Sequence, residues 1–207
     1  MENKERKRNA AQALLKTEAV FFRPEEPFTW ASGIKSPVYT DNRLVLTSPD
    51  ARRVIEEGLM ELIQETWPEA EALFGTATAG IPHAAIAGYM MDLPMGYVRS
   101  GAKDHGRANR IEGRVQPGQK VVVVEDLIST GGSCIEAAKA LQEAGAQVLG
   151  VACIFSYNLS KSRSAFADAG LKYYSLTDFD CVAQTAAEMK YISEEDIAQL
   201  MEFRNNL

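Results

Sequence analysis

Strongly apolar stretches alternate with stretches of helical periodicity along most of the chain. Residues 121–124 are four consecutive valines, a run that is typical of a strand buried on both faces. From Ser133 onward, apolar residues recur at helical spacing until Gly145. A strand, a loop and a helix in this order indicate a βαβ unit, in which ligands bind beyond the carboxyl end of the strand.

The same alternation predicts the rest of the fold. Prolines and glycines divide residues 20–39 into short extended pieces, which indicates a small cap over a site, and we call residues 18–46 the hood. We expect a single domain over residues 1–207 with a core from about 47 to 207. Its class is α/β, with a doubly wound, mostly parallel sheet flanked by helices. Strands are predicted at 72–77, 95–98, 147–155 and 171–176, and helices at 4–15, 49–67, 80–91 and from 194 onward.

The residues that follow the four valines combine two kinds of chemistry. Glu125 and Asp126 offer carboxylate oxygens, which accept hydrogen bonds from sugar hydroxyls and would repel a phosphate. Residues 130–133 offer hydroxyls, backbone N–H groups and the start of a helix, which favour a monophosphate. A ribose phosphate satisfies both halves. An ordinary strand-to-helix turn is the alternative that stays open, whereas Walker A and GxGxxG patterns are missing.

The stretch at 100–113 is the second region with candidate chemistry. Basic residues outnumber acidic ones in and around it, although the whole chain has a net charge of -6. A long connection without secondary structure is unusual in a compact domain unless it is a lid or a binding loop. His105 can donate to phosphate oxygens near neutral pH, whereas His83 at a helix start is expected to serve packing or capping. A solvated basic loop is the alternative.

Three segments resemble one known family. VVVVEDLISTGGS at 121–133 resembles the phosphoribosyl diphosphate (PRPP) motif of the type I phosphoribosyltransferases. FTWASGIKSPVYTDNR at 28–43 resembles the N-terminal signature of the orotate phosphoribosyltransferases, and RSGAKDHG at 99–106 resembles their mobile catalytic loop. The segments occur in the family's order, and the resemblance covers nearly all 207 residues.

The resemblance implies transfer of the phosphoribosyl group of PRPP to orotate, which gives orotidine 5'-monophosphate and pyrophosphate in pyrimidine synthesis. Such a displacement requires stabilisation of charge rather than a protein nucleophile. The resemblance implies catalytic roles for Arg99, Lys103, His105 and Asp126. The implied PRPP contacts are Arg99, Lys103, His105, Glu125, Asp126, Leu127, Ile128, Ser129, Thr130, Gly131, Gly132 and Ser133, and the implied orotate contacts are Ser129 and Lys35.

The resemblance also implies a metal ion and a partner subunit. Mg²⁺ is expected to bridge diphosphate and ribose oxygens, with water in its other positions, so no protein metal ligand is predicted. In the family the catalytic loop generally serves the neighbouring subunit's site. Lys103 and His105 would therefore act across a homodimer.

The chain departs from the family pattern at several positions. Ala31 stands where many members have Lys, and Ser100 where a second basic residue is common. Thr78 and Ala79 replace a frequent Tyr-Lys pair, and Asn158 lies near a position where Arg commonly helps to hold orotate. These departures leave the PRPP interpretation intact and reduce the number of charged groups available to the base.

Two other classes of function stay open. A regulatory PRPP-binding module would keep the Glu125 loop but need not keep the Lys103 loop, so the KDHG segment favours an enzyme. A phosphoribosyltransferase for a purine or another base would replace the hood segment, so FTWASGIKSP favours orotate.

Composition sets the remaining limits. The chain is 46% hydrophobic and 24% charged, as in ordinary globular proteins, and its negative net charge argues against sequence-independent nucleic-acid binding. Cys134, Cys153 and Cys181 are odd in number and far apart, which predicts small core residues in a reducing cytosol. A charged N-terminal stretch and the lack of a long apolar run predict a cytoplasmic protein without a membrane span.

Overall fold

The computed structural model of the chain describes residues 2–23, 26–29, 35–101 and 110–207. Its elements in chain order are α1 (Glu2–Lys16), β1 (Val20–Phe22), β2 (Phe28–Thr29), β3 (Lys35–Ser36), β4 (Val38–Thr40), the 3-10 helix η1 (Asn42–Thr47), α2 (Pro49–Thr66), β5 (Ala72–Thr76), α3 (Gly80–Met91), β6 (Met95–Val98), β7 (Ile111–Glu112), β8 (Lys120–Ile128), α4 (Gly132–Glu143), β9 (Gln147–Ser156), α5 (Ser160–Asp168), β10 (Tyr173–Asp178), α6 (Phe179–Glu188) and α7 (Glu194–Asn205).

A six-stranded sheet with the order β10-β9-β8-β5-β6-β7 forms the centre of the described structure. All neighbouring strands are parallel except β7, which pairs antiparallel with β6. The predicted α/β class with a mostly parallel sheet is therefore confirmed. The chain runs from β5 to β6 on one side and then returns to β8 on the other side of β5. The strand order thus reverses between β5 and β8, where open α/β sheets bind ligands.

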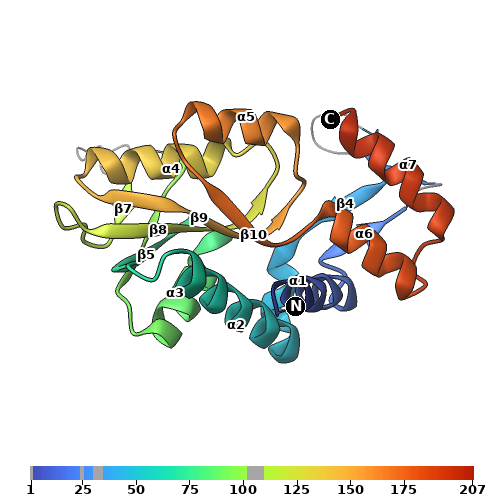
Figure 1. Ribbon diagram of the computed structural model, residues 1–207, viewed down its shortest axis with the longest axis horizontal. Helices are drawn as coiled ribbons and strands as arrows, with labels where there is room; N and C mark the ends of the chain where they lie inside the picture. Colours follow the sequence, from blue (N-terminus) through green and yellow to red (C-terminus); the bar gives the residue numbers. More distant parts are fainter. Residues whose placement is uncertain (1, 24–25, 30–34, 102–109) are drawn as a thin grey trace.

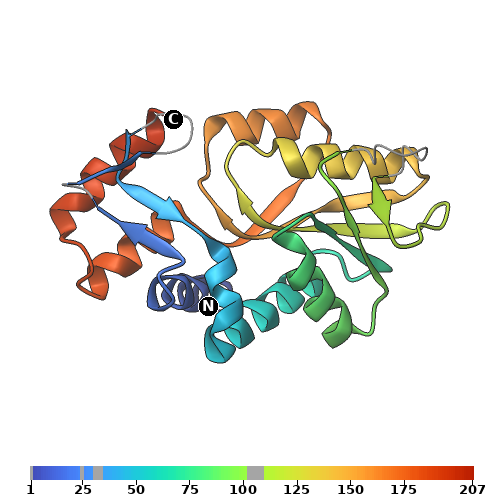
Figure 2. The ribbon, with the colours of Figure 1, turned by 180° about the vertical axis from the view of Figure 1, so that it is seen from behind.

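Helices cover both faces of this sheet. Figures 1 and 2 show α2 and α3 against one face and α4 and α5 against the other. The four valines of β8 are fully buried because their side chains alternate between the two layers. Val122 and Val124 join the apolar cluster that contains residues of α1, α2 and α3, whereas Val121 and Val123 join the cluster that contains residues of α4. A run of four apolar residues is therefore what this strand requires.

The hood lies beside the sheet together with both terminal parts of the chain (Figure 1). Its strands form two small antiparallel pairs, β1 with β4 and β2 with β3. Helix α1 packs against α2, α6 and β10, and α7 packs against α6. N-terminal and C-terminal elements thus form one end of the molecule, as the reverse view in Figure 2 also shows.

Several boundaries differ from the sequence prediction. Strand β8 continues to Ile128, because Leu127 and Ile128 still pair with Phe155 and Ser156 of β9; the acidic pair therefore lies inside the strand rather than after it. The last strand, β10, begins and ends two residues later than predicted. Part of the stretch predicted to lack secondary structure forms β7, at the edge of the sheet.

Helices α5 and α6 were not predicted. Helix α5 has a weak apolar pattern, since Phe166 is its only buried large apolar side chain. The boundaries predicted for β5, β6, α2 and α3 agree with the structure to within one residue. Cys134 and Cys153 are buried as predicted, whereas Cys181 is partly exposed. Among the described residues, no helix combines the length and apolar character needed to cross a bilayer.

Candidate active site

The acidic pair of β8 lies where the strand order reverses. The Thr76 hydroxyl at the end of β5 donates to Oε1 of Glu125 at 2.7 Å, which joins the two strands on either side of the reversal. Helix α3 begins close by. A Cβ added at Gly80 would stand 2.4 Å from the carbonyl oxygen of Val124, so only glycine lets this helix start lie so near β8. The start of α3 and the acidic pair thus share one edge of the sheet.

Glu125 is buried, with 5% of its surface exposed, and its carboxyl oxygens accept several protein hydrogen bonds. Besides Thr76, the Asp126 backbone N–H donates to Oε1 and the Ser133 hydroxyl donates to Oε2, both at 3.0 Å. All of these donors are neutral. Burial, and after it a side-chain hydrogen bond with Asp126, raise the pKa of Glu125, and the Thr76 bond lowers it, with a net value of about 8. The fold therefore favours the protonated, neutral form of Glu125 more than water does for an ordinary glutamate.

Asp126 differs from its neighbour because it is only partly buried. Its backbone carbonyl accepts a hydrogen bond from the Asn42 side-chain amide at 2.8 Å. The segment that ends the hood is therefore bound directly to the acidic pair. Since Glu125 is buried and turned toward protein donors, the Asp126 carboxyl group is the one of the pair that a ligand can reach.

The loop after β8 is short and leads straight into α4. Gly131 has a φ of 85°, and a Cβ there would lie 2.6 Å from the Phe166 ring of α5, so backbone conformation and packing both require glycine. Gly132, by contrast, has open space where a Cβ would stand. No described protein atom explains the missing side chain at Gly132. An anion that approaches the backbone N–H groups at the start of α4 does explain it.

Comparison with known proteins identifies the family. The model of the phosphoribosyl transferase domain matches residues 45–179, which include the acidic pair and the loop. Orotate phosphoribosyltransferase of Bacillus subtilis (strain 168) is 56% identical over 196 residues, which are 95% of this chain and 91% of that protein. The chain belongs to the orotate phosphoribosyltransferase family.

Solved structures of orotate phosphoribosyltransferases share the fold. The enzyme of Aeropyrum pernix superposes with a TM-score of 0.76 at 27% identity, over 88% of this chain and 99% of that one. The Mycobacterium tuberculosis H37Rv enzyme in complex with PRPP superposes with a TM-score of 0.63 at 26% identity, over 84% of this chain and 98% of that one.

The remaining residues that the family resemblance singled out are spread around this site. Arg99 follows β6 at the carboxyl edge of the sheet, and its Nε lies 3.2 Å from Oε1 of Glu112 in β7. Lys35 is exposed on β3 of the hood, and its ammonium donates to the Thr29 hydroxyl at 2.8 Å. Ser129 and Thr130 form the loop between β8 and Gly131. Lys103 and His105 lie outside the described residues, and their roles stay predictions.

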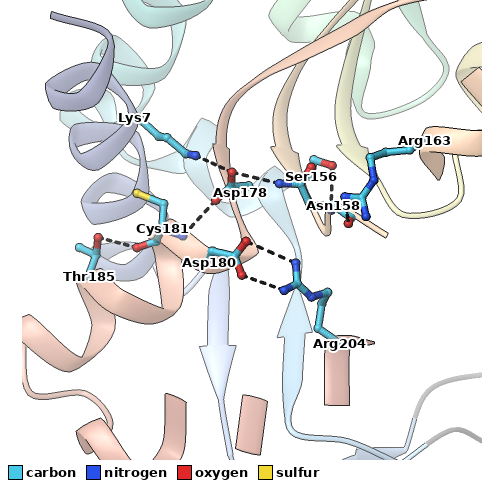
Figure 3. Close-up of polar contacts among 9 residues, drawn as sticks. All are labelled: Lys7, Ser156, Asn158, Arg163, Asp178, Asp180, Cys181, Thr185 and Arg204. Carbon is cyan, nitrogen blue, oxygen red and sulfur yellow. Dashed lines mark hydrogen bonds and ion pairs between the residues drawn. The ribbon is translucent and has the colours of Figure 1, made fainter. Parts of the chain in front are cut away.

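Asn158 lies in a polar junction between the sheet and the terminal helices of this orotate phosphoribosyltransferase-family chain (Figure 3). The Asn158 amide donates to Oδ2 of Asp178 at 3.2 Å, and the Lys7 ammonium donates to the same oxygen at 2.5 Å. Arg163 of α5 donates to the Asn158 carbonyl oxygen at 2.7 Å. The Asn158 side-chain amide is thus directed to Asp178, which caps α6.

His83 packs in the interior, as predicted, and does not cap its helix. Its Nδ1 lies 2.6 Å from Oε1 of Glu56, and both side chains are buried between α2 and α3. Burial raises the pKa of Glu56, and the bond to His83 opposes that shift. This pair joins the two helices on the face of the sheet opposite α4.

Two residues of the site were missed from the sequence. Thr76 ends a strand and bonds to Glu125, and Asn42 holds the Asp126 backbone. The strand predicted at 72–77 places Thr76 near the carboxyl edge of the sheet, so the sequence could have marked it as a candidate site residue. Nothing in the chain pattern could have joined Asn42 to a residue 84 positions away.

Proposed function

We propose that the protein transfers the phosphoribosyl group of PRPP to orotate, which gives orotidine 5'-monophosphate and pyrophosphate in pyrimidine biosynthesis. One observation carries the proposal: an acidic pair and an open glycine loop meet at the strand reversal of a chain that is 56% identical, over 95% of its length, to an orotate phosphoribosyltransferase. Fold and sequence thus support the same reaction.

The acidic pair serves the ribose. In the reaction, the bond between C1 of the ribose and the pyrophosphate oxygen breaks, and a new bond forms to a ring nitrogen of orotate. Positive charge develops on the sugar ring, so a nearby carboxylate stabilises the transition state. Asp126 accepts from the ribose hydroxyls, and Glu125 joins it once the Thr76 and Ser133 hydroxyls release its oxygens.

The loop at 129–133 holds the 5'-phosphate through backbone N–H groups and hydroxyls at the start of α4. The backbone of Leu127 and Ile128 extends this contact surface along β8. Lys35 of the hood and Ser129 of the loop contact the base. Ser133 must turn away from Glu125 to reach the phosphate, because its hydroxyl donates to that carboxyl in the free protein.

Arg99, Lys103 and His105 neutralise the charge of the leaving pyrophosphate. Arg99 stands at the carboxyl edge of the sheet, on the β6 side of the acidic pair, which supports this assignment. A loop that closes over the site would also exclude water, which could otherwise attack the ribose in place of orotate.

Mg²⁺ fits this site as an ion that arrives with the diphosphate. The described residues contain no group of three or more His, Cys, Asp or Glu side chains arranged to hold a metal ion. Glu125 and Asp126 do offer hard oxygen donors, and Asp126 would act on the ion through the ribose hydroxyls that it holds. When bound, the ion offsets the negative charge of the diphosphate.

We propose a homodimer in which each catalytic loop completes the partner's site. On α3, Tyr89 is 88% exposed and Met90 lies next to it, which supports a protein contact there. Mixing Lys103→Ala with Asp126→Asn tests the exchange of loops. Loops acting across the dimer would restore about a quarter of the sites in an equal mixture, because half of the dimers are mixed and each has one intact site. Loops acting within one subunit would restore none.

A cytoplasmic location belongs to the same proposal. Cys134, Cys153 and Cys181 form no disulfide in the described part of the chain, which supports a reducing compartment.

The proposed reaction is tested by the fall in orotate absorbance when the purified protein is mixed with orotate, PRPP and Mg²⁺. Uracil and hypoxanthine are assayed in parallel. Turnover of orotate alone supports both the reaction and the choice of base. Binding of PRPP without turnover of any base would replace the proposal with a regulatory PRPP-binding module.

A further inference from the structure

Asn42 connects the hood to the ribose side of the site. It is the first residue of η1, which directly follows the hood strand β4 and Asp41, and only 1% of its surface is exposed. Its side-chain Nδ2 donates to the backbone carbonyl oxygen of Asp126 at 2.8 Å. The two residues are 84 positions apart, so this bond fixes the end of the hood to β8.

The bond joins β8 just beyond the point where its pairing with β5 ends. Strand β5 pairs with β8 only as far as Val124, and the register between β8 and β9 skips Asp126. The Asn42 amide donates to the Asp126 carbonyl oxygen at this point, beside the carboxyl group that a ligand can reach.

Stability alone does not account for an asparagine at position 42. Its side-chain oxygen, Oδ1, is buried and has no hydrogen-bond partner in the described part of the chain. The stabilisation from one amide hydrogen bond is no larger than the cost of one buried polar atom without a partner. Asn42 is therefore no net stabiliser. What the residue provides is the position of the backbone that it holds.

We propose that Asn42 is a positioning residue of the transfer reaction. By holding the Asp126 backbone, it keeps the Asp126 carboxylate aligned with the ribose hydroxyls and fixes the hood against the sugar-binding edge. The inference rests on the proposed function, in which Lys35 of the hood contacts the base. A base held by the hood is then in register with the ribose carbon that it attacks, and small errors in such alignment reduce rates strongly.

Asn42→Leu removes the amide while keeping a similar volume, and Thr40→Val is its matched control. The Thr40 hydroxyl also joins hood and core, through a 3.0 Å contact with the Tyr157 hydroxyl, but it does not touch Asp126. We expect Asn42→Leu to weaken PRPP binding in calorimetry and to lower kcat/KM for PRPP, each about tenfold, with the melting temperature unchanged. Thr40→Val should lower the melting temperature while PRPP affinity stays at the wild-type value.

Asn42→Asp separates the donor from the shape of the side chain. It keeps the outline of Asn42 but places an acceptor against the Asp126 carbonyl oxygen, so its loss of PRPP affinity should equal or exceed that of Asn42→Leu. If Asn42→Leu does not fold, Asn42→Ala removes the same amide without adding volume and replaces it in the comparison.

Wild-type PRPP affinity in a folded Asn42→Leu or Asn42→Ala protein would overturn the inference. So would a variant of Asn42 that loses melting temperature and keeps its affinity, as Thr40→Val is expected to do. A wild-type protein that turns over no base would remove the proposed function instead. The PRPP affinities of wild type and variant would still decide the role of Asn42, because calorimetry needs no turnover.

Discussion

Glu125 and Asp178 are two buried carboxyl groups near the same edge of the sheet, and they differ in what surrounds them. Glu125 lies near the end of β8 and Asp178 ends β10, with 5% and 7% of their surfaces exposed. Glu125 accepts from Thr76, Ser133 and the Asp126 backbone, which are all neutral. Asp178 accepts from the Asn158 amide, from the backbone of Cys181 and from the Lys7 ammonium, which carries a positive charge (Figure 3).

The two carboxyl groups differ in whether a cation balances them. Lys7 balances the charge of Asp178, whereas the donors to Glu125 carry no charge. A buried carboxylate with a cation and good hydrogen bonds is already satisfied, so Asp178 serves to attach α1 and α6 to the sheet. Within the described part of the chain Glu125 contacts no cation, and it stands beside a second acid, which is an arrangement found where a ligand supplies the missing partners. Changes at the two places should therefore affect different measurements.

The largest effect is expected from Lys103→Ala, which removes a charge that the proposal assigns to the reaction. A charge that acts on the leaving group is worth about 10²- to 10³-fold in kcat. We expect a loss of this size with an unchanged melting temperature. Steady-state kinetics and a thermal melt check both parts, with the exposed Lys139→Ala as control. Wild-type turnover in Lys103→Ala would remove this lysine from the mechanism.

Asp126→Asn should come next, since it removes the accessible charge of the acidic pair. Two charge-assisted hydrogen bonds to ribose hydroxyls are worth about 3 kcal/mol together, or roughly 10²-fold in PRPP affinity. Calorimetric titration with PRPP measures the change, and Asp168→Asn, an exposed aspartate at the end of α5, is the matched control. Equal affinities for wild type and Asp126→Asn would contradict the ribose assignment.

Lys7→Met tests the other side of the comparison. The side chain keeps its length but leaves the Asp178 carboxylate, whose side chain is 10% exposed, without its cation. We expect unfolding to become easier by about 2 kcal/mol, while kcat and PRPP affinity are retained. Lys4→Met, on the exposed part of the same helix, should change neither quantity. A large loss of turnover with normal stability would move the Asp178 junction into the active site.

Glu125→Gln should act on the pH dependence of stability, by less per pH unit than the roughly 2 kcal/mol expected for Lys7→Met. The pKa of Glu125 is about 8 in the folded protein, above its ordinary value of 4.5. Between these values the folded protein binds more protons than the unfolded chain, so stability falls as pH rises from about 4.5 to about 8, by at most about 1.4 kcal/mol per pH unit.

Glu125→Gln removes this fall, which denaturant titrations across that pH range would detect. The exposed Glu143→Gln should keep the wild-type profile. Identical profiles for wild type and Glu125→Gln would mean that Glu125 is ionised throughout and that a cation lies nearby.

Runs and periodicities of apolar residues predicted the strands and helices whose bounds are set by the sequence nearby. The valines of β8 and the periodicity of α2 and α3 placed these elements to within one or two residues at their starts and located the acidic pair. The end of β8 was wrong because pairing of Leu127 and Ile128 with β9 extends the strand beyond its apolar run. Helix α6 was missed although buried Phe179, Val182, Ala183 and Ala186 follow a helical spacing.

The site shows the same division. The acidic pair and the glycine loop are contiguous in the chain, so their chemistry could be inferred from their order. Asn42 and Lys7 act on residues 84 and 171 positions away, and only the folded chain brings them there. The raised pKa of Glu125 likewise follows from burial, which a strand pattern indicates, and from a side-chain hydrogen bond with Asp126, which the pattern does not indicate.

The packing of α1 against α6 imposes an order on synthesis. The ribosome makes α1 before the central sheet, yet α6, which packs against α1, is made only after the last strand of that sheet. Until then the apolar side of α1, with Ala11, Leu14 and Leu15, lacks this cover and is open to chaperones and to aggregation. A translation stop before Phe179 is therefore expected to leave α1 more open to aggregation than the strands of the central sheet.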